Sequence, residues 1–392
     1  MKTRVISRRF IRVIAPLGLL LALSATASTA SAAQATSLPV LHGLSARTTV
    51  VGGASVLATT RTVPHWHGSF VDGVNGQTYG YNMVGADPST STATNIRTEI
   101  IPLQFTFNAF PGVVPSGDVS QMASWVAESP IFTAQSFPSE PTESLQFEDA
   151  VMRSEFDQVG SSNYHVSLSN TAVLPTVTIA VPSKQGTLGV APDGTIAGVV
   201  SDKWFASQFH SIISSLNLDP STLPIVVDNN VFLYSGTTAD CCVIGFHGAA
   251  NITGTGAGST NGNGDQPVQT FVFASWVSSP QIFGPSFTDI STLTHEVSEW
   301  AQDPFANNEV NSWYFPSSGY PCSNLLEVAD PLTGVAVAFP ATPANPETLS
   351  GPEWHIQDIA NLWWFARQQS QASNSEYSYF GTLTSPAPTC PS

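Results

Sequence analysis

The chain has 392 residues, with 12 lysines and arginines against 28 aspartates and glutamates, and its formal net charge is -16. Such a balance argues against nucleic acid and against an anionic membrane surface as partners. Charged residues make up only 10% of the chain and hydrophobic residues 42%, which argues against a highly charged disordered protein. We therefore expect a globular protein with no nucleic-acid partner, and a monomer.

The N-terminus has the pattern of an export signal. Basic residues come before an apolar run over residues 13–27, and Ala30-Ser31-Ala32 then fits an A-x-A cleavage site. The pair Arg8-Arg9 also suggests a twin-arginine signal. We predict that residues 1–32 are a signal peptide and that the mature protein is secreted and extracellular. No second apolar stretch approaches the ~20 residues that span a bilayer, so we expect no membrane association of the mature form.

The rest of the chain divides by composition. Residues 33–62 are rich in Ala, Ser and Thr with little periodicity, which predicts a flexible leader or a removable pro-segment. Short aromatic and β-branched runs broken by turn residues predict a β-rich N-terminal portion over 63–200. Longer elements predict a mixed α/β C-terminal portion over 201–392. We expect one α+β unit, in which the first portion packs on the second with a cleft between them.

Individual elements follow in chain order. Strands are predicted over residues 97–107, 164–168, 173–181, 224–234, 241–247 and 268–277. Helices are predicted from the N-cap Asp118 to Glu128, over 145–159, and from Asp202 to Asp219-Pro220. Near the C-terminus, Pro352 and the apolar stripe after it predict a tryptophan-rich helix that faces the core.

The cysteines predict disulfides. An even number of cysteines in an exported protein favours disulfide bonds, and no CxxC pair suggests a zinc ribbon. Adjacent cysteines rarely bond to each other. We therefore expect Cys241 and Cys242 each to bond either Cys322 or Cys390, with the choice left open.

One segment carries chemistry, THEVSEWAQDP at 294–304. Asp289 or Ser291 can cap a helix there, and Asp303-Pro304 ends it. On such a helix His295 and Glu299 share a face and can converge on one metal ion. Glu296 directly follows His295 in the sequence and can reach a water molecule bound to that ion, as in HExxH zinc hydrolases.

The HExxE pattern is also common on solvated helices, and three neighbouring features favour the metal site over that alternative. An apolar segment over 270–277 precedes the helix, in the arrangement where an edge strand holds an extended peptide. The helix is short, so that its face can line a cleft. An acidic group downstream, with Glu327 and Asp330, can supply a third ligand. His65 and His67 lie on one face of a predicted strand, where an aromatic edge is favoured over a second metal site.

The run THEVSEWAQDPFANNEVNSW followed by LLEVADP resembles the HELxE and EIGD motifs of the exordium/phosphate-induced family of plant wall proteins and of its secreted bacterial relatives. The segment CCVIGFHGA at 241–249 is similar to a cysteine- and histidine-containing segment of that family. The resemblance touches most of the mature chain, and its specific part is residues 241–330. It implies a zincin-like fold around the HExxE helix.

The resemblance also implies roles for individual residues. His295, Glu299 and Glu327 would bind the metal ion, with Asp330 as a substitute ligand or a partner of one. Glu296 would be the general base, and His247 would stabilise an oxyanion or add a further ligand. Zinc is the expected ion, and a carboxylate-rich site also accepts calcium.

Two functions follow from these residues. The first is a secreted zinc endopeptidase that acts on a polypeptide substrate. The second is a non-catalytic extracellular or wall-associated binding protein that keeps the metal site for structure, since fold does not determine function.

Overall fold

The computed structural model describes residues 38–41, 44–54, 56, 60–139, 143–252, 266–314, 322–340 and 353–391. The predicted signal peptide lies outside these residues. Within them, no helix is both long and apolar enough to cross a bilayer.

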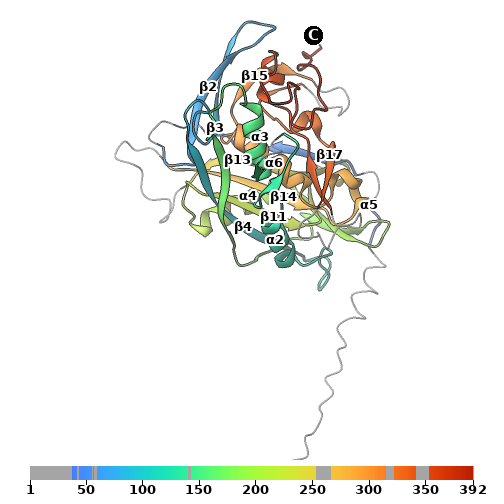
Figure 1. Ribbon diagram of the computed structural model, residues 1–392. Coiled ribbons are helices and arrows are strands. Elements are labelled where there is room, and N and C mark those ends of the chain that lie inside the picture. The colour runs from blue at the N-terminus through green and yellow to red at the C-terminus, as the bar shows by residue number, and fades with distance from the viewer. Residues whose placement is uncertain are drawn as a thin grey trace, which may run out of the picture.

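A ten-stranded mixed sheet forms the centre of the molecule (Figure 1). Its strands are β1 (Arg47–Val50), β4 (Ala93–Phe107), β7 (His165–Val173), β8 (Val177–Val181), β9 (Gly186–Val190), β10 (Ile196–Ser201), β11 (Leu223–Asn229), β12 (Val231–Tyr234), β13 (Cys241–Asn251) and β14 (Val268–Trp276). The strand order is β7-β4-β11-β14-β13-β12-β10-β9, with β1 added to β13 and β8 to β4.

Strands from both predicted portions lie in this one sheet. β4 of the N-terminal portion runs parallel to β11 of the C-terminal portion, and β11 runs parallel to β14. The α+β class is therefore confirmed, but the two portions do not form separate layers with a cleft between them. Part of the predicted leader also belongs to the sheet, because β1 pairs with β13.

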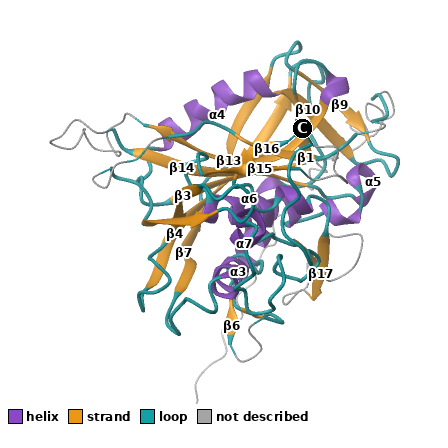
Figure 2. Ribbon diagram, turned by 90° about the horizontal axis from the view of Figure 1, so that it is seen from above, coloured by secondary structure: helices purple, strands orange, loops and turns teal. Residues whose placement is uncertain are grey.

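Helices cover both faces of the sheet (Figure 2). The helices are α2 (Val119–Glu128), α3 (Phe147–Glu155), α4 (Asp202–Leu216), α5 (Pro280–Phe283), α6 (Ser291–Gln302) and α7 (Leu362–Ala366). On one face α4 packs through Phe205 and Phe209 against Phe273 of β14. On the other face α6 contributes Leu293 and Trp300 to the largest core cluster, which also holds residues of α2, α3 and α7. The candidate site therefore lies between the sheet and α6.

The predicted helix caps explain where these helices begin. The Asp118 carboxylate accepts the backbone N–H groups of Ser120 and Gln121, as predicted for the start of α2. Asp202 is the first residue of α4, and Asn217 ends that helix in the left-handed conformation.

The C-terminal tryptophan-rich segment is an exception to the predictions. The predicted helix from Pro352 is wrong, because β18 (Glu353–Gln357) pairs there with β17 (Ala336–Pro340). Only the short α7 is helical. Trp354 and Ile356 are nevertheless buried, as the apolar stripe indicated.

The predicted strand over 224–234 is also divided. Asn230 takes a left-handed conformation with φ 58° between β11 and β12. Its side chain bonds Ser278, both to the hydroxyl and to the backbone N–H. β11 consequently pairs with β4 and β14, while β12 pairs with β10 and β13.

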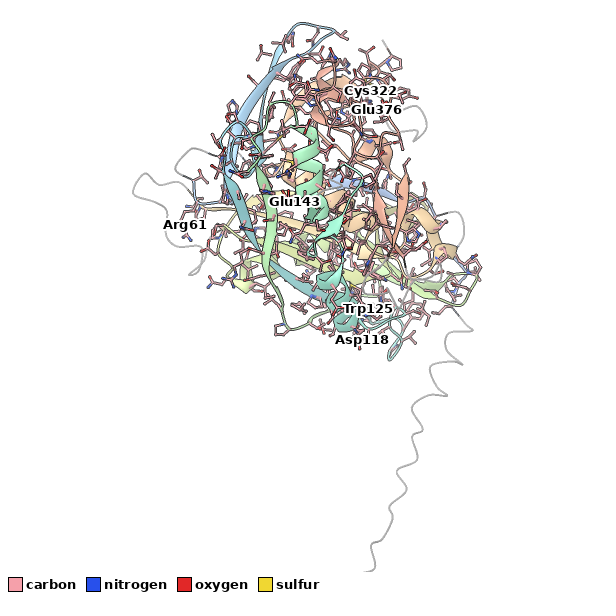
Figure 3. All side chains as sticks on the ribbon, in the orientation of Figure 1. Arg61, Asp118, Trp125, Glu143, Cys322 and Glu376 are labelled. Atoms are coloured by element: carbon pink, nitrogen blue, oxygen red, sulfur yellow. A yellow bond between two sulfur atoms is a disulfide. The ribbon has the colours of Figure 1, made fainter. Side chains whose placement is uncertain are left out.

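The predicted disulfide pairing is wrong. Cys241 bonds Cys242, and Cys322 bonds Cys390. Cys322 lies at the end of the molecule opposite to α2 in Figure 3, and Cys390 reaches it because Thr389 bridges β15 (Glu309–Trp313). Cys242, near the start of β13, is instead fully buried in a core cluster with Phe232 and Ile244, and it bonds the adjacent Cys241.

Candidate metal centre

The HExxE segment forms α6, and carboxylates hold both of its ends. At the start, Asp289 accepts the backbone N–H of Ile290 and the ring Nδ1 of His355. At the end, Asp303 accepts the backbone N–H groups of Asn307 and Asn308. The N-cap position is Ile290 and no side chain caps it, so neither Asp289 nor Ser291 is the predicted cap; Asp289 instead ties the start of the helix to β18.

A glycine lets the sheet approach this helix closely. Gly245 of β13 faces α6, and a Cβ atom there would lie 2.5 Å from Glu296 Oε1 and 2.7 Å from Thr292 Cγ2. The adjacent inward position on β13 is His247, whose ring is fully buried. β13 therefore brings an imidazole directly against the HExxE face of α6.

Three carboxylates surround one nitrogen of this imidazole. His247 Nδ1 lies 3.4 Å from Glu299 Oε2, 3.6 Å from Glu296 Oε2 and 3.9 Å from Glu327 Oε2. The four side chains are between 0% and 4% exposed. They come from three elements: β13, α6 and the loop between β16 (Ser323–Leu325) and the 3-10 turn η3 (Asp330–Leu332).

His295 lies on the other side of Glu299. Its Nε2 is 3.1 Å from Glu299 Oε1 and 3.6 Å from Asp330 Oδ1. The same Glu299 oxygen accepts the backbone N–H groups of Ala329 and Asp330. Asp330 in turn accepts the Thr48 hydroxyl of β1 at 2.8 Å. One oxygen of Glu299 is therefore held by the chain, and the other faces His247.

Two sets of three side chains bring their ligand atoms within 4.8 Å of one another in the described part of the chain. They are His247 with Glu299 and Glu327, and His295 with Glu296 and Glu299. Glu299 belongs to both sets. All six residues predicted for the site from the sequence, including Asp330, thus lie in one cluster.

The donor atoms fit a cation. Both ring nitrogens of His247 and both carboxylate oxygens of Glu296 and Glu327 are buried without a hydrogen-bond partner, and so is Glu299 Oε2. A buried polar group without a partner costs about 1–3 kcal/mol, and a charged one costs more. Imidazole nitrogen and carboxylate oxygen are the ligands of divalent ions such as zinc. These orphaned atoms therefore suit a metal ion that ties them together.

The electrostatics of the cluster follow from its burial. Burial raises the pKa of Glu296 to about 8 and raises that of Glu327 well above its usual value. Burial also acts to raise the pKa of Glu299, but the adjacent His295 and His247 outweigh it and lower that pKa. Burial disfavours a charged His247, and the surrounding carboxylates reverse this and raise its pKa. The cluster consequently combines one carboxylate of lowered pKa with two carboxylates of raised pKa.

The expected surroundings of the site are partly wrong. β14, predicted as an edge strand that holds a peptide, lies between β11 and β13 in the interior of the sheet. The exposed face of a cleft is also absent from the described residues, because every residue of α6 is buried. Thr48 and Gly245 had no recognisable signal in the sequence, since their roles depend on which strands meet.

The other histidines have structural partners. His165 Nδ1 lies 2.9 Å from Asp149 Oδ2, and His355 bonds Asp289. His65 packs edge-on against Phe305. These contacts give the three side chains structural roles.

Comparison of the chain with protein-family models, with curated proteins and with solved structures found no match.

Proposed function

We propose that the chain binds one zinc ion through His247, Glu299 and Glu327 and is a secreted metal-dependent hydrolase, a zinc endopeptidase. The observation that carries the proposal is the set of buried, unpartnered donor atoms around His247 Nδ1. Removing several ionisable groups from water costs several kcal/mol for each ion unless opposite charge compensates. A divalent cation supplies that charge.

The ligand set supports a catalytic kind of site. Catalytic zinc sites have three protein ligands from imidazole and carboxylate groups and leave a further position for water or substrate. One histidine and two glutamates fit this rule. Two carboxylates also suit calcium, although calcium usually takes six to eight oxygen ligands. We therefore propose zinc first and calcium as the alternative ion.

The neighbouring side chains have distinct roles in this proposal. When bound, zinc acidifies a water molecule and polarises a substrate carbonyl. Glu296 adjoins the ligand set and takes the proton of that water, as the HExxE pattern predicts. His295 and the backbone N–H groups of residues 329 and 330 hold the second oxygen of Glu299, which orients this ligand. Asp330 in turn positions His295.

Peptide hydrolysis, secretion and a zincin-like fold rest on the sequence. The HExxE motif and its resemblance to the exordium-related proteins favour a peptidase, and the pattern of residues 1–32 favours export. The burial of α6 below the sheet supports a related geometry, in which the helix presents Glu296 and Glu299 toward His247 on a strand.

A second function is favoured by one observation. The candidate ligands are buried, and they line neither the cavity beside Phe205 nor the one beside Phe209. A non-catalytic extracellular protein, stabilised by a structural ion, would have such a closed site.

Metal content tests the site. We expect elemental mass spectrometry to find about one zinc per chain in the wild-type protein and in Glu296→Gln. We expect none in His247→Ala, because that variant loses a ligand. His210→Ala is the matched control, since this histidine is exposed on α4 and distant from the described ligand sets. Zinc retained by His247→Ala would contradict the ligand assignment.

Activity separates the two functions. We expect Glu296→Gln to lower casein hydrolysis by a factor of about 10²–10⁴, which is the usual contribution of a general base. A chelator should abolish hydrolysis in the wild-type protein. If the chelator lowers only the melting temperature and no hydrolysis is found, the structural function is correct.

A further inference from the structure

The segment Arg47–Ala54 lies along the candidate metal centre as an added strand. β1 runs parallel to β13, with Thr48 opposite Gly245 and Val50 opposite His247. The pairing continues as Val51 donates its backbone N–H to the carbonyl of His247. β12 occupies this edge of β13 only near Cys241 and Val243, so that β1 covers the edge beside the ligands.

Further contacts attach the segment on both sides of the cluster. The Thr48 hydroxyl donates to Asp330, which adjoins His295. Beyond Gly52 and Gly53, the backbone N–H of Ala54 donates to the carbonyl of Phe305, and the Asn307 side chain donates to the carbonyl of Ala54. The segment therefore passes from the Asp330 side of the cluster, along His247, to the loop that follows α6.

A hydrolase site that is closed in this way needs an opening. A polypeptide must place its carbonyl within reach of the catalytic groups, and the candidate ligands are at most 4% exposed. β13, α6 and the buried loop that holds Glu327 carry those ligands and belong to the core. Segment Arg47–Ala54 carries none of the ligands, and Thr49, Gly52 and Gly53 within it are exposed. It is therefore a covering element that can leave without removing a ligand.

A cavity adjoins the same segment. It has a volume of about 570 Å³, is bordered by Thr48 and Val50, and has apolar walls from Phe205, Val243 and Phe246. This volume lies in the range of ordinary ligand pockets. An extended chain in the place of β1 would thus have an apolar cavity beside it for a side chain.

We propose that segment Arg47–Ala54 is an internal plug. It occupies the position in which an extended polypeptide substrate pairs with the Gly245–His247 edge of β13, and its displacement admits a substrate with an apolar side chain. Strand addition to a sheet edge is a general mode of peptide binding, because main-chain hydrogen bonds give affinity and side-chain pockets give specificity. This inference rests on the proposed hydrolase function.

The experiment uses the full chain with a site-specific protease recognition sequence inserted between Val56 and Thr60. After cleavage, the N-terminal fragment is removed by washing in dilute buffer. We expect casein hydrolysis to rise at least ~10-fold while zinc stays at about one per chain. A synthetic peptide with the sequence of residues 44–54 should reverse the rise. The matched control carries the same insertion in the exposed turn at Asn75-Gly76, between β2 (His65–Val71) and β3 (Thr78–Val84), where cleavage should leave hydrolysis unchanged.

A point variant weakens the plug without cutting the chain. A Cβ atom on Gly248 would collide with the carbonyl oxygen of Val51, so Gly248→Ala should push the segment off β13. We expect this variant to hydrolyse casein faster and to release zinc to a chelator faster than the wild-type protein does. Retention of the wild-type circular dichroism spectrum shows that the variant is folded.

The outcomes separate the two proposals. If the protein contains zinc and is active, and if neither cleavage nor Gly248→Ala changes hydrolysis or zinc release, the plug proposal is overturned. The proposed hydrolase function is then unaffected. Failure of the cleaved protein to bind a fluorescent 44–54 peptide overturns the plug whether or not hydrolysis is found. Binding of that peptide without hydrolysis, before or after cleavage, supports strand addition and overturns the hydrolase function.

Discussion

Gly245 is the residue that allows β13 and α6 to meet. Any larger side chain at this position would occupy the space of Glu296 and Thr292. Its neighbour His247 reaches the carboxylates only because the strand lies so close to the helix. The metal centre therefore depends on a residue that supplies no ligand.

We expect Gly245→Ala to weaken zinc binding by at least ~10-fold and to lower the free energy of unfolding by about 1–3 kcal/mol, as overpacking does. Zinc titration and urea unfolding measure the two effects. In the double variant Gly245→Ala/Glu296→Ala, the clash with the glutamate is relieved. The double variant should consequently lose less stability than the sum of the single variants, and strict additivity would refute the contact.

At this scale the sequence predicted much of the site. The spacing of His295 and Glu299 follows from helix geometry, which is local and can be recognised from residue types. The resemblance to known motifs, rather than any local rule, pointed to His247. Its position against Glu299 depends on the pairing of β13 with its neighbours, which no local pattern encodes.

Among the elements, α3 links the site helix to the C-terminal segment through a buried acid. Glu155 accepts the backbone N–H of Leu362 at 2.6 Å, at the start of α7. Glu148, at the other end of α3, accepts a hydrogen bond from the hydroxyl of Ser298 on α6. Burial raises the pKa of Glu155 from its usual 4.5 to about 8. The folded chain thus keeps a proton on this side chain at pH values where the unfolded chain has lost it.

Stability should depend on pH in a definite direction at Glu155. Because the folded pKa is the higher one, the contribution of this group to stability is largest below pH 4.5 and is lost as the pH rises through about 8. Between these values one proton gives a slope of ~1.4 kcal/mol per pH unit. Glu155→Gln keeps an acceptor for Leu362 and should flatten this slope. Melting curves of both proteins across this range measure the difference, and parallel curves would contradict the pKa shift.

Elements were predictable where their signals are local. The capped helix α2 and the strand β4 were expected from an N-cap residue and from β-branched composition. The segment from Pro352 was assigned to the wrong structure because a buried apolar run fits a helix or a strand equally well. Its pairing with β17, the preceding strand, decides the outcome.

At the scale of the whole molecule, the Cys322–Cys390 disulfide closes a loop with a sequence separation of 68 residues, whereas Cys241 and Cys242 are adjacent. We expect Cys322→Ala/Cys390→Ala to lose about 2–5 kcal/mol of unfolding free energy, because a long loop is constrained in the unfolded state. The Cys241–Cys242 bond closes no such loop, so Cys241→Ala/Cys242→Ala should lose less unfolding free energy. Urea unfolding compares the variants, and non-reducing peptide mapping that found either adjacent cysteine bonded to Cys322 or Cys390 would refute the pairing.

The fold class was predictable at this scale, and the topology was not. Alternating strand and helix signals indicate an α+β protein, but they do not tell which strand lies at an edge. The sequence of β14 fits an apolar strand at an edge or in the interior, and its place between β11 and β13 is decided by which strands pair with it. The same reason explains why residues 47–50 were assigned to a leader.

The order of the main sheet also governs how the chain folds. Thr98 of β4 pairs with Leu223 of β11, and Thr48 of β1 pairs with Gly245 of β13. The long loops between these paired residues must close before the contacts can stabilise the fold. Non-local parallel pairing is therefore slow to form. During synthesis, β4 can pair first with β7 and β8, but its other edge waits until β11 has emerged, and β11 then waits for β14. The central sheet, and with it the carboxylates around His247, can therefore assemble only late, after most of the chain has left the ribosome.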